Sequence, residues 1–144
     1  MRIIDRFSIE HDVFLSQLEV IEDLSARGAD IAAIAAAIRT LEAPLLAHAE
    51  NEERVLFPFL GEAMRDAVSV LVDEHATLHA YLERLVAEPT RWELEMALEA
   101  FLRVLRGHIQ KEEQAFFPAA ADILDDAQLE LLDRDVRPVA PALA

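Results

Sequence analysis

Hydrophobic residues recur along this chain at the spacing of amphipathic helices. The first stripe advances in alternating steps of three and four residues and consists of Ile4, Phe7, His11, Phe14, Leu18 and Ile21. Such a stripe is the seam of a helix packed in a bundle. Asp5 is a candidate N-cap and Gly28 a candidate stop, so a first helix is expected between them.

A second stripe follows Asp30, the expected cap of the next helix. It carries Leu41, Leu45, His48, Glu52, Val55 and Phe59. Pro44 lies inside this stripe and is expected to bend the helix or to divide it in two. Pro58 and Gly61 then mark a turn into a third helix. The buried face of that helix is predicted to hold Met64, Val68, Leu71, His75, Leu78 or His79, Leu82 and Leu85.

The fourth stripe begins after Pro89, where Thr90 and Glu93 have the spacing of a capping box. Its seam is Leu94, Leu98, Phe101, Leu105, His108, Glu112 and Phe116. The pattern weakens after Pro118; 126–133 is predicted as a short helix and 137–144 as a loose tail. The sequence therefore predicts an all-α, up-down-up-down four-helix bundle over 1–120, with a short C-terminal helix and tail over 121–144.

Composition supports this fold and narrows the chemistry. The chain has 144 residues, of which 53% are hydrophobic and only 3 are glycine, a balance that favours one domain of long helices. Cysteine is absent, which excludes thiolate metal sites and cysteine nucleophiles. A net charge of −15 disfavours nucleic acid and anionic membranes as partners. No apolar run is expected to span a membrane, so we expect a soluble, cytoplasmic protein.

The second and fourth helices repeat one motif. HAENEERVLFP begins at His48 and HIQKEEQAFFP begins at His108, and both read H-x-x-x-E-E-x-x-x-F-P. The first and third helices echo each other through Glu10-His11 and Glu74-His75. The bundle is therefore predicted to consist of two similar helical hairpins around a shared centre.

Every histidine of the chain falls on or beside a predicted buried stripe. These residues are His11, His48, His75, His79 and His108, and Glu52 and Glu112 follow two of them by four residues, on the same helix face. Buried imidazoles and carboxylates are normally paired or bound to a metal, and these seams contain no lysine or arginine. The seven side chains therefore predict a bound cation of a kind that accepts both nitrogen and oxygen, namely Fe, Mn, Zn or Ni.

Seven ligands are too many for one ion and suit two metals, bridged by the two carboxylates and an oxo or hydroxo group. Five histidines would divide three to two, which leaves an open position for a small ligand. His79 is the least secure of the ligands, because its counterpart in the repeat is Leu15. Glu53 and Glu113 lie one residue off the seam and are expected to face solvent or to orient a histidine.

The order H…H-x-x-x-E…H-x-x-x-H…H-x-x-x-E resembles the hemerythrin-like family of HHE cation-binding domains, over about residues 4–118. The resemblance implies a non-haem di-iron centre. It also implies that His75, His79 and His108 ligate one iron and His11 and His48 the other, with Glu52 and Glu112 as bridges. Oxygen-carrying hemerythrins place an aspartate five residues after the last histidine, whereas Glu112 here follows His108 by four, which favours the bacterial HHE branch.

Several functions fit such a centre. The leading hypothesis is a di-iron protein that binds or senses dioxygen or a similar diatomic molecule. The alternative is a peroxide- or nitric-oxide-reactive protein, or one that donates iron for repair under oxidative or nitrosative stress. No catalytic residue is predicted, whether the protein is an enzyme is left open, and the oligomeric state is not predicted. Two rival signatures are missing from the sequence: Glu-x-x-His of ferritin-like proteins and H-E-x-x-H of zinc proteases.

Overall fold

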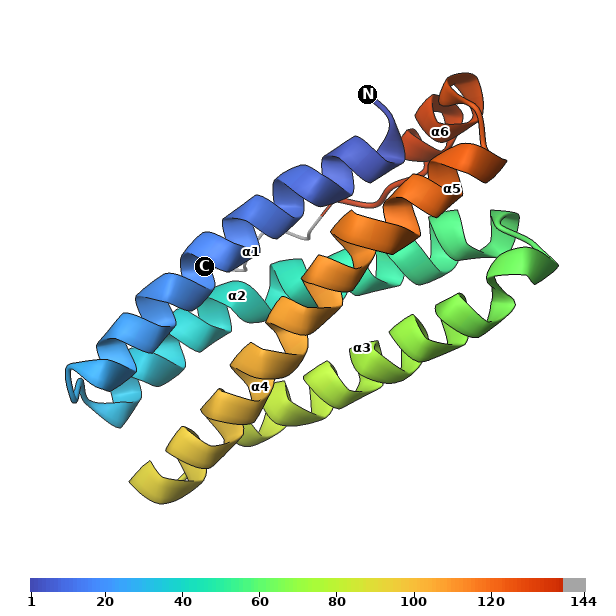
Figure 1. The fold of residues 1–144 in the computed structure, drawn as a ribbon. Coiled ribbons are helices and arrows are strands. Elements are labelled where there is room, and N and C mark those ends of the chain that lie inside the picture. The colour runs from blue at the N-terminus through green and yellow to red at the C-terminus, as the bar shows by residue number, and fades with distance from the viewer. Residues whose placement is uncertain (139–144) are drawn as a thin grey trace.

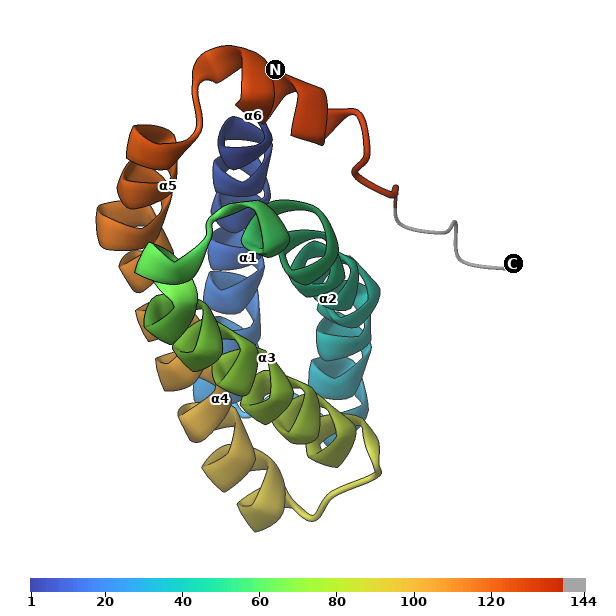
Figure 2. The same cartoon turned by 90° about the vertical axis from the view of Figure 1, so that its right-hand side faces the viewer.

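A computed structural model describes residues 1–138, and these form helices and connecting turns without a β-strand. The four long helices are α1 (Ile3–Ala26), α2 (Ile31–Asn51), α3 (Arg65–Val86) and α4 (Arg91–Lys111). Each contacts its neighbour in the chain, and α4 returns to contact α1. The result is the predicted up-down-up-down bundle (Figure 1), and the view turned by 90° shows the helices arranged around a common axis (Figure 2).

The helix ends follow the local sequence signals. Gly28 follows α1 with a φ of 73°, a left-handed conformation that glycine adopts without strain. Thr90 caps α4 because its hydroxyl accepts a hydrogen bond from the backbone N–H of Glu93. Two short 3₁₀ turns, Phe57–Phe59 and Glu62–Met64, form the link between α2 and α3 on either side of Gly61. The boundaries at Gly28, Thr90 and Gly61 confirm the sequence predictions. The prediction that Asp5 caps the first helix is wrong, since α1 begins at Ile3 after Arg2 and Asp5 lies in its first turn.

Pro44 and Pro118 both lie within helical segments. Of the two outcomes expected at Pro44, a bend or a division of the helix, the division is wrong, since α2 continues through it with Leu41 and Leu45 buried on either side. Pro118 does not end the helical path. It lies in the first turn of α5 (Phe117–Ile123), which continues directly from the preceding π turn. Packing therefore outweighs the hydrogen bond lost at Pro44.

Two π-helical turns interrupt the motif-bearing helices at equivalent places. Glu52–Leu56 follows α2 directly, and Glu112–Phe116 follows α4 directly. Both turns begin at the glutamate four residues after a histidine. Single π turns of this kind are frequent at functional sites.

The apolar core consists of two clusters separated along the bundle axis. One packs Phe14, Leu18 and their neighbours near the α1–α2 loop, and the other packs Phe7, Val55 and their neighbours near the N-terminus. The buried polar side chains, which include four histidines and two glutamates, belong to neither cluster. They form a polar layer between the two halves of the core.

One helical run requires a correction to the sequence expectation. By length and composition alone, Ile31–Phe59 is long and apolar enough to cross a membrane. In the structure, Ile34, Ile38 and Leu41 of this run are buried in the core of the bundle. One face of this run therefore packs against other helices of the bundle.

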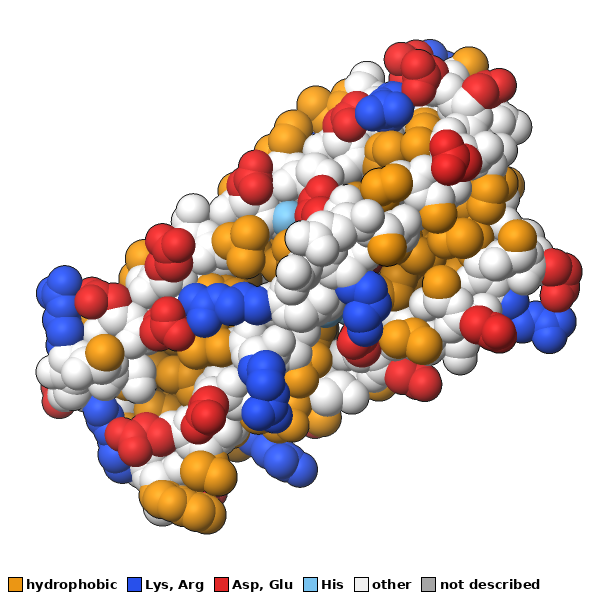
Figure 3. Space-filling model, in the orientation of Figure 1, with side chains coloured by type: hydrophobic (Ala, Val, Ile, Leu, Met, Phe, Trp, Pro, Cys, Tyr) orange, Lys and Arg blue, Asp and Glu red, His pale blue; other side chains and the backbone are white. Residues whose placement is uncertain are grey.

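The surface carries charges of both signs. On the face shown in Figure 3, acidic and basic side chains lie close together, and hydrophobic side chains gather between α3 and α5. Met64, Val70 and Phe116 line an apolar groove at that place. The negative net charge is thus not gathered on this face.

The C-terminal segment packs back onto the bundle. Helix α6 (Asp126–Asp133) matches the predicted short helix, and its N-cap Asp125 forms a capping box with Gln128. The side chain of Asn51 donates to the backbone carbonyl of Arg137 and accepts from its N–H, at 2.9 Å each. The predicted loose tail lies largely at residues 139–144, outside the described residues.

We predict that Asp133→Asn lowers the free energy of unfolding by about 1 kcal/mol or less. The Arg6 guanidinium donates two hydrogen bonds to Asp133, at 2.6 and 2.9 Å, and joins α1 to α6. Hydrogen bonding from Arg6 lowers the pKa of Asp133, so its contribution is present above pH 3.8 and is lost as pH falls through the lowered pKa. Urea denaturation of both proteins, near neutral pH and in acid, measures the difference.

Asp126→Asn is the matched control, because Asp126 pairs with Arg2 but is 79% exposed. Its effect should be smaller. Equal losses in the two variants would contradict a specific role for the Arg6 contact.

Candidate metal centre

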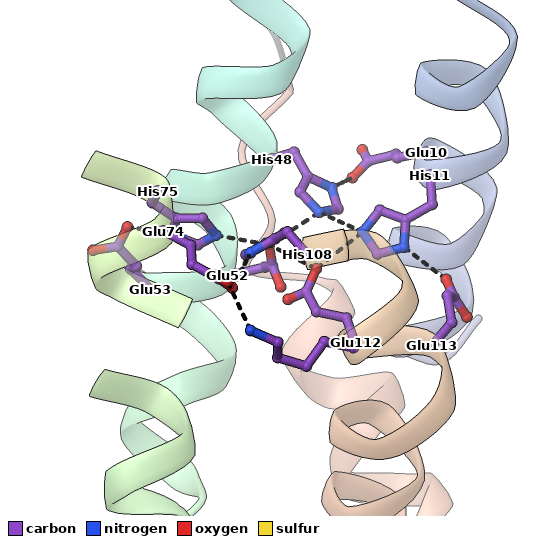
Figure 4. Close-up of polar contacts among 11 residues, drawn as sticks. Glu10, His11, His48, Glu52, Glu53, Glu74, His75, His108, Glu112 and Glu113 are labelled. Carbon is purple, nitrogen blue, oxygen red and sulfur yellow. Dashed lines mark hydrogen bonds and ion pairs between the residues drawn. The ribbon is translucent and has the colours of Figure 1, made fainter. Parts of the chain in front are cut away.

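Six buried side chains from all four long helices and their π turns meet in the polar layer (Figure 4). They are His11 of α1, His48 of α2, Glu52 at the start of the first π turn, His75 of α3, His108 of α4 and Glu112 at the start of the second π turn. We refer to these six as the donor cluster. None is more than 8% exposed. The structure thus brings together six of the seven predicted ligands.

The histidines of the donor cluster form two pairs. The rings of His11 and His48 lie 4.8 Å apart, and those of His75 and His108 are also 4.8 Å apart, tilted by 50° and 54° respectively. Each pair combines one odd-numbered and one even-numbered helix. The two halves of the centre are therefore related as the sequence repeat predicts.

Both glutamates of the donor cluster lie between the pairs. Glu52 Oε1 is 3.0 Å from His48 Nε2 and 3.4 Å from His75 Nε2. Glu112 Oε1 is 3.1 Å from His11 Nε2 and 3.2 Å from His108 Nε2. Each carboxylate thus faces one histidine of each pair.

A second set of carboxylates surrounds the donor cluster. Each histidine of the cluster contacts one of these outer glutamates through Nδ1: His48 with Glu10, His75 with Glu53, His108 with Glu74 and His11 with Glu113, at 2.7 to 3.0 Å. A carboxylate only accepts hydrogen bonds, so Nδ1 carries the proton. Nε2 of all four rings is therefore directed toward the centre and left for a metal.

Adjacent glutamates serve different purposes because of helix geometry. Neighbouring residues on a helix point in directions roughly 100° apart. Glu52 can therefore enter the centre while Glu53 reaches sideways to His75 on α3, and Glu112 and Glu113 do the same toward α1. The expectation that Glu53 and Glu113 orient histidines is confirmed. The same role for Glu10 and Glu74 was not predicted, although the repeated Glu-His pairs were a signal for it.

Aromatic rings fix the histidines from the side. Phe117 stacks on His11 with ring centroids 5.5 Å apart, and Phe57 lies parallel to His75 at 6.1 Å. Neither contact was predicted from the sequence. Their place in the repeated F-P motif was the signal that both would adopt equivalent positions.

The donors fit a metal because their buried atoms have no other partner. Both carboxylate oxygens of Glu52, both of Glu112 and Nε2 of His75 make no hydrogen bond among the described residues. In addition, Nε2 of His11 and Nε2 of His48 are only 3.1 Å apart, although neither has a proton when its ring is neutral. Two lone pairs at that distance repel each other unless a positive charge lies beside them. A buried set of nitrogen and oxygen donors such as this suits a transition metal.

The pKa values of the buried histidines and of Glu112 also show that positive charge is favoured in this layer. Burial alone would lower the pKa of His48, but the Glu52 carboxylate raises it to about 10. Burial would also lower the pKa of His108, but hydrogen bonding from the ring to Glu112 and the charge of that carboxylate raise it to about 9. Burial and the nearby charge of Glu52 raise the pKa of Glu112. Protons therefore occupy this layer when no metal does.

His79 is the one predicted ligand that does not join the donor cluster. Its side chain is 54% exposed, and its Nε2 is 3.4 Å from Glu83 Oε1 on the surface of α3. Leu78 takes the buried position instead. Without His79, the expected three-to-two division becomes two histidines on each side.

A narrow cavity of about 10 Å³ lies beside the histidines, enough for the centre of one water-sized molecule. All four histidines of the donor cluster line it. The opposite walls are apolar and include Phe14, Leu45, Leu82 and Leu105. A small molecule next to the donor cluster would thus meet few competing polar groups.

We predict that the metal-free protein loses stability as pH rises from 6.5 to about 10. The pKa values of His48 and His108 are raised in the folded state, so their stabilising contribution is complete below pH 6.5 and disappears as each folded pKa is passed. Urea denaturation at a series of pH values, with a chelator present, measures this. The metal-loaded protein should show a weaker dependence, because the cation replaces the protons. A flat profile without metal would contradict the prediction.

The comparisons with known proteins agree with this geometry. A search of the curated proteins and a search of the solved structures each gave no match. The family model described as the hemerythrin HHE cation binding domain matches residues 2–120, a range that contains the whole donor cluster. The chain therefore belongs to the hemerythrin HHE cation-binding family.

Proposed function

We propose that this protein binds two non-haem iron ions in the donor cluster and binds or senses a small diatomic molecule, such as dioxygen, beside them. The observation that carries the proposal is the set of buried carboxylate oxygens of Glu52 and Glu112 that lack a hydrogen-bond partner among the described residues. Burying such groups without compensation costs several kcal/mol each, on the order of the effective penalty for a buried ion. A bound cation removes that cost.

Two ions are favoured over one by the way the donors are grouped. Glu112 belongs to both sets of donors that lie close enough together to hold an ion, one with His11 and His48 and the other with His75, His108 and Glu52. A single ion would have to be ligated by both histidine pairs at once. Glu112 would then not be common to two separate sets of donors. We infer that His11 and His48 would hold one ion and His75 and His108 the other, with Glu52 and Glu112 supplying the negative charge between them.

Iron is favoured over zinc by the charge around the centre. Glu52, Glu112 and the four outer glutamates surround four imidazoles, which would be neutral when they bind a metal. Among the described residues, only one of these six glutamates contacts a basic side chain. Glu74 accepts a hydrogen bond from Lys111 at 2.7 Å. Such an excess of negative charge stabilises trivalent ions more than divalent ones. Iron reaches the trivalent state, whereas zinc does not.

The protein's own residues would bind the metal, orient the ligands and exclude water from the centre. The outer glutamates hold the histidine rings, and the apolar walls of the cavity keep competing water away from the donors. Iron would supply the electrons that a diatomic ligand accepts. The histidines are divided equally, so we do not assign the ligand to one ion. A cytoplasmic location remains a prediction from composition.

A second candidate function is reaction with peroxide or nitric oxide. It is favoured by the partial exposure of Glu53 and Glu113, whose side chains are 40% and 36% exposed while they contact His75 and His11. These contacts give the centre a link to solvent protons, which reductive chemistry consumes and reversible binding does not. Catalytic loss of peroxide by the iron-loaded protein would favour this candidate.

We predict about two iron ions per chain, in protein purified without a tag from iron-replete cells. Inductively coupled plasma mass spectrometry measures the metal content. Glu52→Ala and His108→Ala should lose most of the iron, because each removes a donor. Glu10→Gln should weaken iron binding about 10- to 100-fold, since it leaves the donors intact and releases only the ring of His48.

His79→Ala is the control for these variants and should keep the iron content of the parent protein. Loss of half the iron or more in His79→Ala would show that His79 is a ligand. One metal per chain, or zinc in place of iron, would overturn the di-iron proposal.

We predict that anaerobic ferrous protein mixed with dioxygen gives a new absorption band that disappears when oxygen is removed. The apolar cavity should slow proton delivery to the bound ligand and so favour its release intact. Ultraviolet–visible spectra over several cycles test this. Irreversible bleaching with release of iron would contradict reversible binding and favour the reactive alternative.

A further inference from the structure

Two hollows adjoin on the side of the bundle where α2 faces α3. The inner one is the narrow cavity beside the donor cluster. The outer one is a surface groove of about 380 Å³, lined in part by Glu50, Arg54 and Val72, which we call the α2–α3 groove. Leu46, Ala49, His75 and His79 line both hollows. These shared side chains therefore lie between the groove and the cavity.

His79 is the least firmly held of the shared side chains. Its contact with Glu83 is long at 3.4 Å and lies on the surface, where such pairs contribute little. The rings of the donor cluster are instead held at Nδ1 by outer glutamates at 3.0 Å or less. Exposed side chains change rotamer in picoseconds to nanoseconds. His79 can therefore move without disturbing the donors.

The sequence repeat allows the side chains that cover the donor cluster on the α2–α3 side to be compared with those on the α4–α1 side. At the equivalent positions across the centre, Ile109 stands in place of Ala49 and Leu15 in place of His79. Ile109 is buried in the apolar core. Arg106 stands in place of Leu46 and donates to both carboxylate oxygens of Glu22, at 2.9 and 3.0 Å. The donors are repeated, but the side chains that cover them are larger and better anchored on the α4–α1 side.

We propose that small uncharged molecules reach the donor cluster through the α2–α3 groove, past Ala49, and that His79 acts as the movable part of this passage and not as a ligand. The proposal rests on the proposed function and adds its route and its selectivity. Apolar walls such as Phe14 and Leu45 disfavour charged ligands inside. The two carboxylates Glu50 and Glu53 outnumber the single basic side chain of the groove lining, Arg54, so the groove disfavours anions. Dioxygen and nitric oxide have the required size and neutrality.

The first experiment measures the kinetics of nitric oxide binding to anaerobic ferrous protein by stopped flow. Ala49→Ile, which installs the residue of the opposite side, should slow association and dissociation several-fold and leave the equilibrium affinity nearly unchanged. His79→Ala should accelerate both steps. Leu15→Ala, the equivalent truncation on the α4–α1 side, is the matched control and should change neither.

A second blocking variant protects the test against misfolding. Ala76 is exposed and lines the α2–α3 groove from outside, so Ala76→Leu narrows the passage without entering the core. It should slow both steps as well. Circular dichroism and iron content confirm that each variant is folded and loaded. Unchanged rates in both Ala49→Ile and Ala76→Leu, or equal acceleration by Leu15→Ala and His79→Ala, would overturn the proposal.

A measurement without iron separates this proposal from the function on which it rests. Dissolved dioxygen is paramagnetic and increases the relaxation of nearby methyl groups in zinc-loaded protein. Leu46, Leu82 and Leu105, which line the cavity, should show a strong effect, and Ala49→Ile should reduce it at Leu82 and Leu105. If this pattern holds but iron-loaded protein binds no diatomic ligand, the route stands and the proposed function falls. No effect at these leucines would overturn the route.

Discussion

Charge compensation in the polar layer is the constraint on which the rest of the structure depends. Four imidazoles and two carboxylates lie between two apolar clusters, where water cannot solvate them. Without a cation, protons must supply the positive charge, and this is why the pKa of His48 rises to about 10. With a cation, the same donors become ligands. The bundle can therefore close around this layer only when the layer binds something positive.

The second constraint is the orientation of the histidine rings. The repeated motif satisfies it because each helix holds a histidine of another helix. Each long helix supplies a histidine to the donor cluster, and it or the turn that follows supplies a glutamate that holds a histidine of another helix. Glu10 of α1 holds His48 of α2, while Glu74 of α3 holds His108 of α4. Helices that exchange such contacts cannot rotate independently. The positions of the ring nitrogens are consequently set by the packing of the whole bundle.

The sequence predicted the parts of this arrangement that depend on spacing within one helix. Gly28, Thr90 and 126–133 marked real boundaries because caps and stops act locally. It could not decide between Leu78 and His79, since residues three and four positions after His75 both flank the same stripe. It also could not identify the partners of the outer glutamates, because those contacts depend on how two helices are rotated against each other. At Pro44, packing of the flanking leucines outweighed the local signal.

Symmetry and asymmetry in this molecule have different physical origins. The donors and the outer glutamates must match in both halves, because each buried charge needs its partner at hydrogen-bonding distance. The side chains that cover the centre are under a weaker constraint, since apolar contact is satisfied by many residues of different size. Ala49 and Ile109 differ for this reason, as do His79 and Leu15. The part of the bundle that is free to differ between its two halves is therefore the part that can decide which molecules reach the metal.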